Sequence, residues 1–84
     1  METLKVKLGV YPSATVLSKL VSLFSSLDSV AYIENEDGSK RVLAKSIIGL
    51  LSFRLRQYQN ISITFYGDYA KNDAIYIERE LRLL

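Results

Sequence analysis

A chain of 84 residues has room for one small domain, and its 11 basic and nine acidic side chains leave a net charge of +2, too small to indicate a nucleic-acid partner. The absence of cysteine and histidine excludes disulfides, thiolate or imidazole metal ligands and any phosphohistidine intermediate. The N-terminus does not resemble a signal peptide, and no run approaches the roughly 20 apolar residues of a membrane span. We therefore expect a single domain over residues 1–84, located in the cytoplasm.

The first predicted elements are a strand and a helix. Apolar and basic residues alternate over Leu4–Leu8, which predicts a half-buried strand that Gly9 and Pro12 close. Helical spacing of apolar residues over Ala14–Leu27 predicts a helix with a wide apolar face. The serines on the other side of this helix are expected to form a solvated face: Ser18, Ser22, Ser25 and Ser26.

A hairpin and a short helix follow. Val30–Glu34 and Lys40–Leu43 are predicted strands, joined by a turn with the Asp-Gly hairpin signal at Asp37 and Gly38. A helix is expected from Ser46 to about Arg56. Gly49 inside this helix costs about 1 kcal/mol relative to alanine and suggests close packing of another backbone.

The last predicted pair is again a strand and a helix. Ile61–Tyr66 alternates and Gly67 ends it, and a helix with one apolar face begins near Ala70 or Lys71. Asp73 is expected as first-turn charge of this helix. The order strand, helix, strand, strand, helix, strand, helix predicts an α+β protein, a two-layer sandwich with three helices on one face of a four-stranded sheet.

The titratable residues do not form a recognisable catalytic pattern. The acidic side chains fall in a turn or on helix surfaces, where two carboxylates are not expected to converge in a pocket for general acid–base catalysis. There is no phosphate-binding glycine loop, nucleophile elbow or metal-ligand spacing. We therefore predict that the protein is not an enzyme and has no catalytic residues, no cofactor and no metal.

Ser46 in the segment LAKSIIGLLSF is the leading candidate functional residue, with two interpretations. As a helix cap, its hydroxyl would accept the amide hydrogen of Ile48 or Gly49. As a regulatory phosphate acceptor, it would place the new charge at a helix N-terminus, near Lys45, Lys40 and Arg41.

The helix after Ser46 has more apolar residues than one buried face can use. We expect Ile47, Ile48 and Leu51 to be exposed as an apolar patch, which together with Lys45 would dock a partner protein. The alternative is that the first or third helix covers them.

Nucleic-acid binding is the less favoured alternative function. Basic residues cluster in sequence around Ser46, and six tyrosines are scattered along the chain, so the predicted sheet could stack unpaired bases. No RNP-type aromatic motif and no GXXG loop support this interpretation.

The stretch Ala44–Phe53 resembles the regulatory-serine segment of HPr, the histidine-containing phosphocarrier of the bacterial sugar phosphotransferase system. Ile61–Gly67, followed by Asn72-Asp73-Ala74, resembles the last strand and last helix start of that family. The resemblance covers essentially the whole chain and implies the HPr open-faced sandwich, β-α-β-β-α-β-α, with an antiparallel sheet.

The resemblance breaks at the phosphocarrier loop. HPr carries its phosphoryl group on a histidine before the first helix, but Tyr11 or Ser13 holds that place here, and Pro12–Val16 lacks the supporting arginine. The chain is therefore most similar to the histidine-lacking catabolite-repression HPr-like proteins. This similarity implies phosphorylation of Ser46 by HPr kinase/phosphorylase and docking to a transcription regulator through Ile47, Ile48 and Leu51.

Two other roles stay open beside this one: a protein-binding module of HPr descent that works without phosphorylation, and the nucleic-acid-binding sandwich. No membrane partner is expected. Because the first strand lies at a sheet edge in this fold, the protein is expected to be a monomer or a weak dimer.

Overall fold

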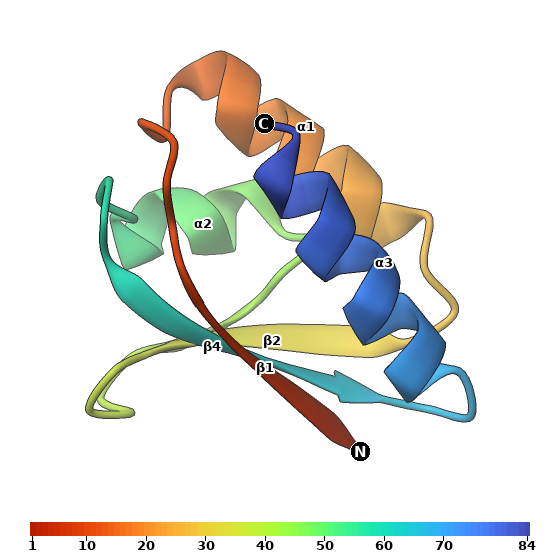
Figure 1. Cartoon of the computed structure of the whole chain (residues 1–84). Coiled ribbons are helices and arrows are strands. Elements are labelled where there is room, and N and C mark those ends of the chain that lie inside the picture. The colour runs from red at the N-terminus through yellow and green to blue at the C-terminus, as the bar shows by residue number, and fades with distance from the viewer.

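Seven elements follow one another in the order β-α-β-β-α-β-α in the computed structural model, which describes residues 1–84. They are β1 (Glu2–Lys7), α1 (Ala14–Ser25), β2 (Val30–Asn35), β3 (Arg41–Leu43), α2 (Ile47–Phe53), β4 (Asn60–Tyr66) and α3 (Ala70–Arg82). The strands form one antiparallel sheet in the order β1-β4-β2-β3, and the three helices lie on one face of it (Figure 1). The predicted open-faced sandwich is confirmed.

The core lies between the sheet and the helices because both carry one apolar face. Ile33 on β2 and Ile63 on β4 are directly paired, and each is 1% exposed. Leu20 and Phe24 of α1 and Ile77 of α3 pack onto this layer. The opposite face of the sheet has no helix over it, and exposed side chains there include Lys5, Lys7 and Tyr66.

The strands begin and end within two residues of the predicted bounds, whereas two helices are shorter than expected. The helix predicted over Ala14–Leu27 ends at Ser25. The helix predicted to reach about Arg56 ends at Phe53, because Arg54 adopts a left-handed conformation with φ of 60°. Leu55 is therefore buried from a loop rather than from a helix.

The β2–β3 hairpin turns where Asp-Gly predicted it. The N–H of Gly38, whose φ is +75°, donates to the Asn35 carbonyl at 3.0 Å. Donation by the hydroxyl and the backbone N–H of Ser39 lowers the pKa of the Asp37 carboxyl below its ordinary value of 3.8. The turn therefore holds this exposed carboxylate in its charged form.

Asp73 has a second role that the sequence analysis missed. It lies in the first turn of α3, as expected, and one of its oxygens accepts from the backbone N–H of Ser29 at 3.0 Å and from its hydroxyl at 2.5 Å. Ser29 is only 8% exposed. Asp73 therefore ties the start of β2 to α3.

No helix combines the length and the apolar character that crossing a bilayer requires.

Candidate functional site

Ser46 links β3 to α2 and caps the helix. Its backbone is extended, with φ of −99° and ψ of 114°, and its Oγ accepts from the Gly49 N–H at 3.0 Å. Its carbonyl accepts the Leu50 N–H at 2.9 Å. The capping interpretation is confirmed, and because the residue is only half-buried, the hydroxyl lies near the surface.

Gly49 leaves room for this cap. A Cβ at position 49 would lie 3.3 Å from the Cβ and Oγ of Ser46 and 3.3 Å from the Cβ of Val42. The expectation that Gly49 packs against another backbone is therefore wrong, since its close neighbours are two side chains. Its small size keeps the Ser46 hydroxyl close to the helix.

The apolar residues of α2 divide between core and surface. Leu50 and Phe53 are each 1% exposed, whereas Ile47, Ile48 and Leu51 are 41%, 74% and 59% exposed. We call these last three residues the α2 patch. Neither α1 nor α3 covers it, so the predicted exposure is found.

Of the three cations expected near Ser46, only Lys45, its neighbour in the chain, has no other partner. Lys45 is exposed and forms no ion pair. The Lys40 ammonium donates to the Phe53 carbonyl at 3.4 Å, at the other end of α2. Arg41 pairs with Glu34 at 3.2 Å on the open face of the sheet. The predicted cation cluster around Ser46 is therefore wrong for Lys40 and Arg41, because the pleat of β3 turns the Arg41 side chain toward the uncovered face.

The β1–α1 loop holds the two residues considered for the histidine position. Ser13 caps α1 and accepts the Val16 N–H at 3.2 Å, so its hydroxyl serves the helix. Tyr11 lies in the loop before it and is 68% exposed. A hydrogen bond from the Tyr58 N–H to the Leu8 carbonyl, 2.6 Å long, fixes this loop against the α2–β4 connection.

The α2–β4 connection contains two strained residues that the sequence analysis did not single out. Arg54 and Tyr58 have φ of 60° and 66°, a region that non-glycine residues rarely adopt. Both side chains are exposed. Neither residue type favours this conformation, so no local signal in the sequence could have revealed it.

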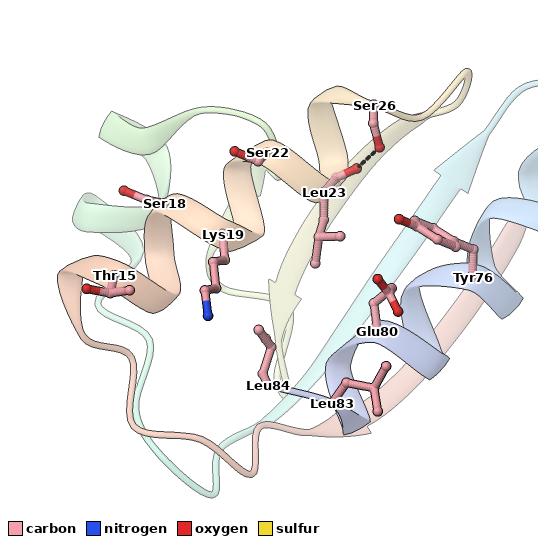
Figure 2. A pocket seen from close by; sticks show the side chains of 10 residues that line it. All are labelled: Thr15, Ser18, Lys19, Ser22, Leu23, Ser26, Tyr76, Glu80, Leu83 and Leu84. Carbon is pink, nitrogen blue, oxygen red and sulfur yellow. Dashed lines mark hydrogen bonds between the residues drawn. The ribbon is translucent and has the colours of Figure 1, made fainter.

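A groove of about 700 Å³ lies between α1 and α3 (Figure 2). Ser18, Ser22 and Ser26, expected to be a solvated face, are exposed as predicted and line one wall, and Tyr76 and Glu80 line the other. Ser46 and the α2 patch are not among the lining residues of this groove.

No three acidic side chains come together in a group that could hold a metal ion.

Comparison with known proteins gives one match by sequence and several by structure. The family model described as "PTS HPr component phosphorylation site" matches residues 3–79. No curated protein is detectably similar in sequence.

The similar solved structures share the whole fold. HPr-C-His from Thermoanaerobacter tengcongensis superposes with a TM-score of 0.83 at 24% identity, over 96% of this chain and 90% of that one. The phosphocarrier protein HPr of Bacillus anthracis gives 0.81 at 24% identity, over 90% of each chain. An HPr dimer from T. tengcongensis gives 0.67 at 23% identity, over 96% of this chain and 98% of that one.

Proposed function

The chain belongs to the HPr family of the phosphotransferase system, and on this premise we propose that it is a regulatory member acting through Ser46 phosphorylation and protein docking. Members of this family carry phosphoryl groups and do not catalyse reactions themselves. This chain has no histidine to carry one. We place its regulatory role in carbon catabolite control in the cytoplasm, with an HPr kinase/phosphorylase and a transcription regulator as partners.

One observation carries the proposal: Ser46 caps the helix that presents the α2 patch and directly precedes the first patch residue in the chain. Ser46 is half-buried and precedes Ile47, so a phosphoryl group on its Oγ would add about two negative charges at the margin of an exposed apolar surface. Lys45, exposed and unpaired, is the cation adjacent in the chain. A partner that contacts both the patch and the phosphoryl group would bind with different affinities before and after phosphorylation.

Phosphorylation is tested directly with HPr kinase/phosphorylase and ATP, followed by intact-mass measurement and peptide mapping. We expect one added phosphoryl group on the wild-type protein and none on Ser46→Ala. Ser52→Ala, which removes an exposed serine of the same helix, is the matched control and should be modified like the wild type. No modification, or modification that survives Ser46→Ala, refutes the Ser46 assignment.

Docking is tested with the phosphorylated protein and a catabolite control transcription factor in a binding titration. We expect Ile48→Asp and Leu51→Asp to weaken binding at least about tenfold, a loss of about 1.4 kcal/mol. Both positions are more than half exposed, so thermal unfolding should change little. Two results together would identify a docking module that works without phosphorylation. In that case Ser46→Ala would bind the partner as tightly as the phosphorylated wild type, and Ile48→Asp would still bind more weakly.

A further inference from the structure

The uncovered face of the sheet carries an aromatic cluster on its two central strands. All three helices lie on the other face (Figure 1). Tyr32 on β2 and Tyr66 on β4 meet here with ring centroids 6.0 Å apart and an interplanar angle of 80°. Tyr66 is 38% exposed, and Val30, its directly paired neighbour, is 43% exposed. One end of the two central strands therefore presents a partly exposed apolar surface on this face.

Arg41 on edge strand β3 extends this cluster. Its guanidinium carbon lies 4.0 Å from the centroid of the Tyr32 ring, and one of its N–H groups donates to the Tyr66 hydroxyl at 3.2 Å. Another nitrogen pairs with Glu34 at 3.2 Å. These contacts hold the guanidinium in place over the ring, where its planar surface adds to the stacking area.

The opposite edge strand supplies free cations to the same face. The pairing register joins Lys5 of β1 to Ser62 of β4 and Ser62 to Glu34 of β2, so these side chains share the face of Tyr32 and Arg41. Lys5 and Lys7 are exposed and form no ion pair.

A hollow of about 330 Å³ beside these lysines is lined by Lys5, Lys7, Glu36, Asn60, Ser62 and two apolar residues. Glu36 is the acidic group at this rim, and Arg41 already engages Glu34. The two lysines therefore outnumber the unpaired carboxylate at the hollow.

We propose that this face binds single-stranded nucleic acid, with bases stacked on Tyr66 and on the Arg41–Tyr32 pair and phosphates held by Lys5 and Lys7. A sheet with aromatic side chains on its central strands and cations on its edge strands suits unpaired bases, because every base offers a flat surface. Successive residues on one face of a strand lie about 6.8 Å apart, which suits an extended chain of nucleotides. A duplex keeps its bases stacked on one another and cannot use the tyrosines.

This proposal does not rest on the regulatory role of Ser46. Ser46 caps α2, which belongs to the helical layer, whereas the lysines and tyrosines point away from that layer. Either activity can fail while the other stands.

The test is fluorescence anisotropy with a short labelled oligouridylate, measured as salt is raised from low to physiological ionic strength. Two neutralised phosphates predict a slope of about −1.4 in log K against log salt, since each contributes about −0.7. Tyr66→Ala should weaken binding about tenfold or more. The double variant Lys5→Glu/Lys7→Glu should lose most of the affinity and flatten the salt slope toward zero.

The matched control is Lys19→Glu/Lys71→Glu, the same change of charge at exposed positions of α1 and α3. We expect it to bind within about threefold of the wild type, because distant exposed charges are largely screened by salt. The proposal is overturned if the wild type shows no salt-dependent binding, if both double variants lose affinity equally, or if duplex RNA binds as tightly. Equal binding of polyglutamate also overturns it and points to an acidic protein partner.

Discussion

At the scale of single residues, Ser46 combines a structural contact with its proposed regulatory role. Its hydroxyl satisfies the Gly49 N–H at 3.0 Å, a helix-end donor with no partner inside the helix. We predict that Ser46→Ala lowers the free energy of unfolding by about 1 kcal/mol, whereas Ser46→Asp, which caps equally well, leaves it nearly unchanged. Urea denaturation monitored by circular dichroism measures both, and equal stability of Ser46→Ala and Ser46→Asp would show that the cap contributes nothing.

Tyr58 is the clearest case of local strain. Its φ of 66° favours glycine, and its side chain is 67% exposed. We predict that Tyr58→Gly is more stable than Tyr58→Ala by about 1 kcal/mol, because alanine keeps the steric penalty of the left-handed region. Both variants lose the same ring contacts, so their difference in thermal unfolding isolates the backbone term. If alanine proves the more stable, the strain at this position is absent.

At the scale of elements, the Asp73–Ser29 pair fastens α3 to the start of β2. Asp73→Ala leaves the Ser29 N–H, on a residue 8% exposed, without its charged acceptor. We expect a loss of about 2 kcal/mol in the free energy of unfolding. Asp68→Ala removes the same charge from an exposed residue near the same helix start and should cost less than about 0.5 kcal/mol. A similar loss in both variants would assign the effect to the helix dipole instead.

The elements themselves were predictable from local patterns. Alternation located the first and fourth strands, 3.6-residue spacing located the helices, and Asp-Gly located the hairpin of the second and third strands. The end of α2 was not predictable. An apolar residue at position 55 continues the helical pattern, but the left-handed Arg54 places Leu55 in a loop from which it still reaches the core.

At the scale of the whole molecule, the fold is that of a phosphocarrier without its histidine. We predict that enzyme I with phosphoenolpyruvate transfers no phosphoryl group to this protein, since the proposed place of the histidine holds Tyr11 or the capping Ser13. Autoradiography after incubation with labelled phosphoenolpyruvate measures the transfer, with the HPr of Bacillus anthracis as the positive control. A stable label on this chain would contradict the regulatory assignment.

The sequence by itself determined the element order, the Ser46 cap and the surplus of apolar residues on α2, because each depends on neighbours within a few positions. Tertiary structure alone decided which distant residues meet. Asp73 reaches Ser29 across 44 positions, and Arg41 reaches Tyr66 across 25. The strand order β1-β4-β2-β3 placed Tyr32 and Tyr66 side by side, and the pleat of β3 turned Arg41 away from Ser46. Strand pairing and pleat set these contacts, and the spacing of residues along the chain does not predict which distant residues meet.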